Sequence, residues 1–213
     1  MQPVEPPSFD GDWYDEWIPW VLDHGLPPLP PTLGDDDAVP VARWVGAPFG
    51  AVLFVQWDGN MDEDGERSLS SEIEVFRRLG DRWEPPSTGG GGGWFDPPFV
   101  RPHLPPEYAV LSHFHSGGGP LQGPSEGTPS WTYSSAYGFT GTAAKTVEVE
   151  DEEGTIERPI ESPLGVFIVV ADATQGAIVR VRREDRNILL EEQFSPPTTA
   201  PDAWGDDWGN GRW

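Results

Sequence analysis

Six short stretches with the composition of β-strands follow one another between residues 108 and 194, and they limit the fold more than any other feature of the sequence. Short segments that contain glycine, such as DEEG and ATQG, separate several of them and are typical of turns. Short strands at this spacing predict a mainly β chain with an antiparallel β-sandwich. The predicted strands are residues 108–115, 131–139, 143–149, 164–171, 177–183 and 187–194.

The last of these strands also suggest an architecture. The segment 146–194 resembles the run of strands in immunoglobulin-like sandwiches. The resemblance is one of pattern and implies an arrangement of strands, because likeness at the level of a fold does not carry a function.

The first half of the chain adds fewer strands. Residues 41–45, 51–57 and 72–78 are predicted strands, and the acidic segment 58–71 is a predicted hairpin loop. Together with the second half they form one predicted domain, residues 38–195. Seven prolines and five consecutive glycines lie within residues 85–107, which we interpret as a long surface loop without regular structure. The alternative is a boundary between two halves.

An acidic, aromatic arm precedes this domain and a similar tail follows it. In the arm, residues 1–37, the spacing of Trp13, Trp17 and Trp20 places three indoles on one face of a helix predicted within residues 12–24. Gly25 is a suitable helix end, whereas Pro19 disfavours a regular helix. The tail, residues 196–213, has few aliphatic residues. Long Gly/Pro-rich loops are predicted to connect the strands of the domain.

The charge of the chain restricts its partners. The 36 acidic residues outnumber the 13 basic ones, for a net charge of −23. Such a field repels nucleic acid and anionic membranes, so we expect neither as a partner. The sequence has no cysteine, no leader-like start and no long apolar run, which together favour a cytoplasmic protein. The acidity indicates either adaptation to salt or docking of a protein partner, possibly a basic one.

The tryptophans of the two ends supply the first functional hypothesis. An indole ring left in water forgoes about 2–3 kcal/mol of burial, so these rings either fold back onto the domain or bind a partner. We therefore predict a non-catalytic protein-binding or regulatory module and leave its oligomeric state open. Its predicted binding residues are Trp204, Trp208 and Trp213, followed by Trp13 and Trp17.

Three histidines offer a metal site instead. His113 and His115 lie two apart on a predicted strand, so both imidazoles would project from one face. They could bind zinc or another transition metal, with His103 or a carboxylate completing the site. This would make the protein a metal-dependent enzyme. The alternative is that the pair only borders a glycine-rich loop.

An acidic segment resembles part of a calcium-binding loop. Asn60, Asp62, Asp64 and Glu66 place oxygens at positions 1, 3, 5 and 7, with Gly65 at position 6. Position 12 would be Ser71 where a bidentate glutamate is needed, so we interpret the segment as an acidic hairpin loop with at most weak affinity for calcium.

Two further surfaces could bind a ligand. Tryptophan faces on a β-sandwich could stack on sugar rings, which gives a carbohydrate-binding module as an alternative function. An anion-binding face could be formed by Arg180, Arg182 and Arg183 together with Arg77 and Arg78. For these arginines we favour cross-strand pairing with the abundant aspartates and glutamates.

Overall fold

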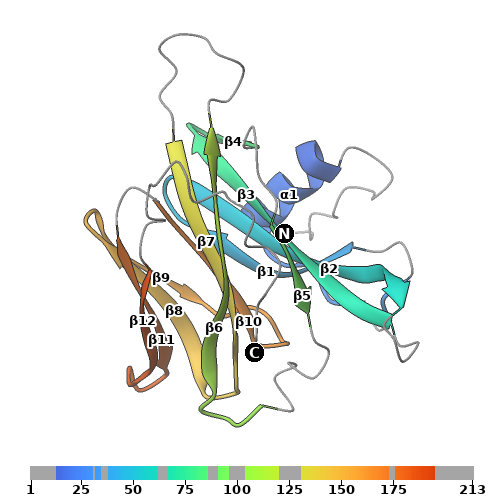
Figure 1. The fold of residues 1–213 in the computed structure, drawn as a ribbon. Helices are drawn as coiled ribbons and strands as arrows, with labels where there is room; N and C mark the ends of the chain where they lie inside the picture. The colour runs from blue at the N-terminus through green and yellow to red at the C-terminus, as the bar shows by residue number, and fades with distance from the viewer. Residues whose placement is uncertain are drawn as a thin grey trace, which may run out of the picture.

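The structure, a computed structural model, describes residues 13–30, 32–34, 38–61, 67–85, 91–95, 104–119, 131–172 and 176–194 (Figure 1). These residues are mainly β, as predicted. They form one helix, α1 (Trp13–His24), and twelve strands. The strands are β1 (Ala38–Val45), β2 (Phe49–Met61), β3 (Arg67–Leu79), β4 (Arg82–Glu84), β5 (Gly91–Phe95), β6 (Ala109–Gly119), β7 (Trp131–Thr140), β8 (Ala144–Asp151), β9 (Gly154–Pro159), β10 (Val166–Asp172), β11 (Ala177–Arg183) and β12 (Ile188–Phe194).

The described strands form three sheets, and all their pairings are antiparallel. The first sheet has the order β1-β2-β3-β4, with β5 also paired to β3. The second has the order β10-β7-β6, and the third β12-β11-β8-β9. Neighbours in the chain pair as hairpins in each sheet, for example Val52 with Glu74 across β2 and β3.

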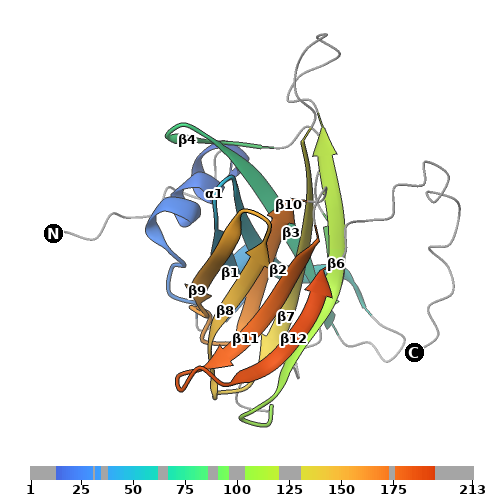
Figure 2. The same ribbon diagram turned by 90° about the vertical axis from the view of Figure 1, so that its left-hand side faces the viewer.

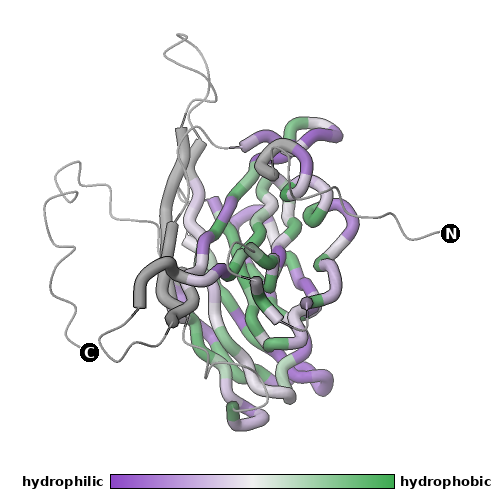
Figure 3. The backbone as a smooth tube through the Cα atoms, turned by 90° about the vertical axis from the view of Figure 1, so that its right-hand side faces the viewer, coloured by the Kyte–Doolittle hydropathy of each residue, from purple (hydrophilic) through white to green (hydrophobic). Residues whose placement is uncertain are grey.

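The first sheet is covered on both faces. Ala51, Leu53 and Val55 of β2 belong to the larger apolar cluster, which β7, β8, β10 and β11 complete from the other two sheets. Val52 and Phe54, which point the opposite way, belong to a second cluster beneath α1. Figure 2 shows α1 on one side of β1 and β2, and β8, β9, β11 and β12 on the other. In Figure 3 the apolar stretches gather where these strands meet.

Helix α1 confirms the helix predicted for the arm. Trp17, Ile18, Val21 and Leu22 form one buried stripe, which packs on Val52, Phe54, Phe76 and Trp83. This burial outweighs the hydrogen bond that Pro19 cannot donate within the helix. The helix ends at Gly25, which adopts φ 108° and donates its N–H to the carbonyl of Val21 at 2.9 Å.

Three expectations about strands need correction. Residues 85–107 were expected to hold no regular structure, yet Gly91–Phe95 pairs with β3 as β5, because backbone pairing needs no side chain. The strand β9 was not predicted, since its polar residues mask the alternation. The acidic loop is also shorter than residues 58–71, because β2 extends to Met61 and β3 begins at Arg67.

Within the described ranges, no helix has the length and apolarity that a membrane-spanning segment requires.

Candidate functional site

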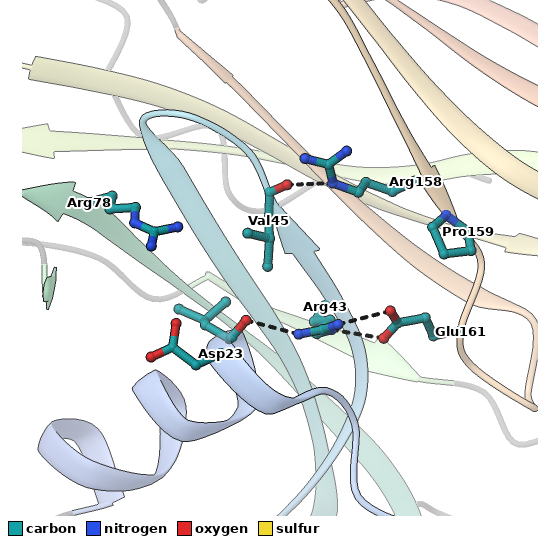
Figure 4. Close-up of a pocket in the computed structure, with 8 residues that line it drawn as sticks. Asp23, Arg43, Val45, Arg78, Arg158, Pro159 and Glu161 are labelled. Carbon is teal, nitrogen blue, oxygen red and sulfur yellow. Dashed lines mark hydrogen bonds and ion pairs between the residues drawn. The ribbon is translucent and has the colours of Figure 1, made fainter. Parts of the chain in front are cut away.

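A charged cleft of about 390 Å³ lies where four elements distant in sequence meet (Figure 4). It is lined by residues from the end of α1, from β1, from the end of β3, and from the end of β9 and the segment that follows it. Its lining residues are Leu22, Asp23, Arg43, Val45, Arg78, Arg158, Pro159 and Glu161. Three arginines around one cleft are notable in a chain of net charge −23.

The first of these arginines, Arg43, uses four of its five N–H donors. Its Nε and Nη2 donate to the two carboxylate oxygens of Glu161 at 2.8 and 3.0 Å. Its Nη1 donates to the carbonyls of Val21 and Leu22 at 3.1 and 2.9 Å. These carbonyls belong to the last turn of α1, which attracts a positive charge. Arg43 therefore fixes the end of the helix to β1 and to the segment after β9.

The second arginine, Arg158, is anchored but has donors left. Its Nε donates to the carbonyl of Val45 at 2.7 Å and its Nη1 to the carbonyl of Glu157 at 2.9 Å. A guanidinium has five N–H donors, so these two hydrogen bonds leave three without a partner among the described residues. Carbonyls also leave its charge unneutralised.

The third arginine, Arg78, is held by an aromatic ring. Its guanidinium carbon lies 5.1 Å from the ring centroid of Trp83, within the range of a cation–π contact. The indole of Trp83 is buried and donates its Nε1–H to Oδ1 of Asp23 at 2.9 Å. Arg78, Trp83 and Asp23 thus form one chain of contacts along the wall of the cleft.

Arg78 and Arg158 differ from six of the other arginines whose side chains the structure describes. Neither makes an ion pair with a carboxylate of the described residues, whereas six other arginines do. Those six are Arg43, Arg82, Arg180, Arg182, Arg183 and Arg186. Arg78 and Arg158 both line the same cleft.

The cross-strand pairing favoured from the sequence holds for Arg180 and Arg182 of β11, whereas Arg183 pairs with Glu107 and Asp185, which lie outside the strands. Arg180 lies opposite Glu148 of β8 and Glu191 of β12 and binds both, together with Glu150. Arg182 donates to both oxygens of Glu148. These hydrogen bonds, that of Arg182 first, lower the pKa of Glu148 to about 2. The guanidiniums of Arg180 and Arg182 are therefore paired with glutamates of the same sheet.

The predicted histidine site lies largely beyond the described side chains. His113 and His115 are on β6, opposite Tyr137 and Ser135 of β7, but only their backbone is described. His103 lies outside the described residues. No group of three or more potential metal ligands is found among the side chains that the structure describes.

The calcium hypothesis meets the same limit. Asn60 lies in β2 with its side chain undescribed, and Asp62, Asp64, Gly65 and Glu66 fall outside the described residues. Ser71, at position 12, is a buried residue of β3 that is 1% exposed.

The predicted tryptophan site changes in one respect. Trp17 was expected among the partner-binding residues, but its ring is 8% exposed and lies 5.9 Å from that of Phe54. Trp17 is therefore part of the core, because α1 folds back onto the sheet. Trp13 begins α1 without a described side chain, and Trp204, Trp208 and Trp213 lie outside the described residues.

Sequence reasoning named Arg78 but missed the rest of the cleft. Arg43 is the residue with the clearest signal, since an arginine within the apolar strand VARWV needs a partner if its stem is buried. Asp23, Arg158 and Glu161 carry no local signal of this kind, because only the fold brings them together.

Comparison of this chain with protein-family models, with curated proteins and with solved structures gave no match.

Proposed function

We propose that the protein is a non-catalytic module that binds another protein, and that the cleft receives an acidic group of that partner. The observation that carries the proposal is the position of Arg78 and Arg158. Both line the cleft, and neither forms an ion pair with a described carboxylate in a chain where acids far outnumber bases.

The chemistry of the two guanidiniums supports this role. A guanidinium binds a carboxylate with two parallel hydrogen bonds, which give direction as well as attraction. Arg158 is fixed by two carbonyls and Arg78 rests on Trp83, so less side-chain entropy is lost on binding. We expect the pair to contribute about 1–2 kcal/mol to an interaction with one carboxylate, roughly a factor of ten in affinity.

The ends of the chain complete the proposal. Trp204, Trp208 and Trp213 keep their proposed role as aromatic anchors, and the surrounding acidic residues would attract a basic surface. A cytoplasmic location and an immunoglobulin-like arrangement of residues 146–194 stay predictions within this proposal.

The test compares the proteins retained by three immobilised full-length chains. These are the wild type, the double variant Arg78→Gln/Arg158→Gln and the control Arg82→Gln, which changes an exposed arginine outside the cleft. We expect a partner that wild type and control retain equally and that the double variant retains at least about ten-fold less. Equal retention of every partner by the double variant would exclude the cleft as a binding site.

A further inference from the structure

We infer that the partner segment entering the cleft carries an acidic side chain next to a basic one, an inference that rests on the proposed function. The cleft offers binding groups of both signs. Within the part of the chain that the structure describes, three donors of Arg158 have no partner and the Arg78 guanidinium makes no recorded hydrogen bond.

The negative binding group is Asp23. Its Oδ1 accepts the indole N–H of Trp83, which fixes the carboxylate in place. Its Oδ2 has no hydrogen bond or ion pair with a described residue, and the side chain is exposed at the cleft. Glu161, the second carboxylate of the lining, is instead bound at both oxygens by Arg43.

The two signs are arranged around the opening. Figure 4 shows Asp23 and Arg78 on the side of α1 and β3, and Arg158 across Val45 on the side of β9. An acidic side chain placed between the two arginines would leave a neighbouring basic side chain within reach of Asp23. Leu22, Val45 and Pro159 supply apolar surface for the stems of both side chains.

The charge of the whole chain favours the same ligand. A net charge of −23 opposes the approach of a purely anionic segment, even though salt limits the field to about 8 Å. A segment that pairs each acid with a base is not repelled. A mixed-charge segment can thus be attracted by the acidic surface through its basic side chain and bind the arginines of the cleft through its acidic one.

The experiment uses three blocked peptides as probes on the full chain. The mixed peptide is Gly-Lys-Glu-Lys-Gly; Gly-Lys-Gln-Lys-Gly lacks the acid, and Gly-Gln-Glu-Gln-Gly lacks the bases. Binding is followed by NMR at the indole N–H of Trp83 and at the Nε–H of Arg158. We expect the mixed peptide to bind about three-fold more tightly than either single-sign peptide.

Two variants assign the preference to residues. Asp23→Asn keeps an acceptor for Trp83 and should abolish the advantage of the mixed peptide over the peptide without bases. Arg78→Gln/Arg158→Gln should abolish its advantage over the peptide without acid. An unchanged spectrum of the buried core shows that each variant is folded.

The outcomes separate the two proposals. If the peptide without bases binds as tightly as the mixed one, the inference of a mixed-charge segment is wrong and the proposed function stands. If inorganic phosphate saturates the cleft more tightly than the mixed peptide does, the ligand is a phosphate group and the inference is also wrong. If no probe shifts either signal, both the inference and the proposed cleft fail.

Discussion

Arg43 and Glu161 form a two-point ion pair at 2.8 and 3.0 Å although 118 positions separate them in the chain. The pair joins β1 to the segment after β9, and Arg43 at the same time binds two carbonyls at the end of α1. One side chain thus links the helix, the first sheet and the third sheet. The geometry of the cleft depends on this link, because Arg43 and Glu161 form part of its wall.

Replacing Arg43 should destabilise the protein more than replacing a surface arginine. Arg43→Gln removes the ion pair and the hydrogen bond to the carbonyl of Leu22, while the carbonyl of Val21 keeps the N–H of Gly25. We expect the free energy of unfolding to fall by about 2 kcal/mol. Chemical denaturation followed by tryptophan fluorescence measures this loss. Arg82→Gln, which breaks an exposed pair with Glu84, should change it by less than about 0.5 kcal/mol. Equal effects of the two variants would contradict the role of Arg43 as a link.

Two glycines should tolerate alanine to different degrees. A Cβ at Gly138 of β7 would lie 2.2 Å from the backbone oxygen of Val110, which cannot move without breaking the β6–β7 pairing. A Cβ at Gly50 would lie 2.8 Å from the ring of Trp83 and 2.9 Å from a methyl of Leu22, both ends of side chains. We expect Gly50→Ala to cost about 1–3 kcal/mol by overpacking.

Gly138→Ala should cost more than Gly50→Ala, and thermal unfolding of both variants checks the order. Relief of the clash at Gly50 would move Trp83, so its variant should also change the near-ultraviolet signal of tryptophan. A smaller loss for Gly138→Ala would mean that β6 and β7 are less closely paired than the structure shows.

The ion pairs of Glu148 should make stability depend on acidity. Hydrogen bonds from Arg182 and Arg180 lower its pKa from 4.5 to about 2, so the folded state binds the proton more weakly than the unfolded state. This contribution is complete above pH 5 and is lost as the pH falls through about 2. Its upper limit, from the shift of the pKa, is about 3 kcal/mol.

The comparison with Glu148→Gln isolates this contribution from the general repulsion among carboxylates, which acid relieves. The difference in unfolding free energy between wild type and variant should be largest near pH 6 and should shrink towards pH 2. A difference that does not change with pH would show that Glu148 is not held ionised by its arginines.

The tail provides a test of the aromatic part of the proposed function. Removing residues 201–213 should leave the free energy of unfolding unchanged and weaken the retained partner by about ten-fold or more. Replacing Trp204, Trp208 and Trp213 together by alanine should act like the deletion. Asp206→Asn/Asp207→Asn should mainly slow association at low salt. Retention of every partner after the deletion would remove the tail from the proposal.

Much of the fold follows from local patterns. The alternation of apolar residues identified most strands, and the indole spacing with Gly25 identified α1 despite Pro19. The strand β5 escaped prediction because its glycines carry no pattern, and β9 because Glu157 and Arg158 are both polar. In each of these cases the partner strand, and not the segment itself, determines the structure.

The cleft could not be predicted in the same way. Leu22, Arg43, Arg78 and Arg158 come from four elements, and nothing in their neighbours signals that they meet. The sequence contains more carboxylates than basic side chains, so it cannot show which arginine has no carboxylate partner. Only the folded structure shows this. The burial of Trp17 could not be predicted from its neighbours in sequence either, since it depends on β2 and β3 lying under α1.

The link through Arg43 has a consequence for biosynthesis. The apolar underside of α1 can be covered as soon as residues up to Trp83 have left the ribosome, because its contacts all lie in the first sheet. Glu161 emerges much later, so until translation has passed β9 Arg43 has only the carbonyls of α1 as partners and lacks its carboxylate. The other face of the first sheet also stays uncovered until then, because β7, β8, β10 and β11 complete that core.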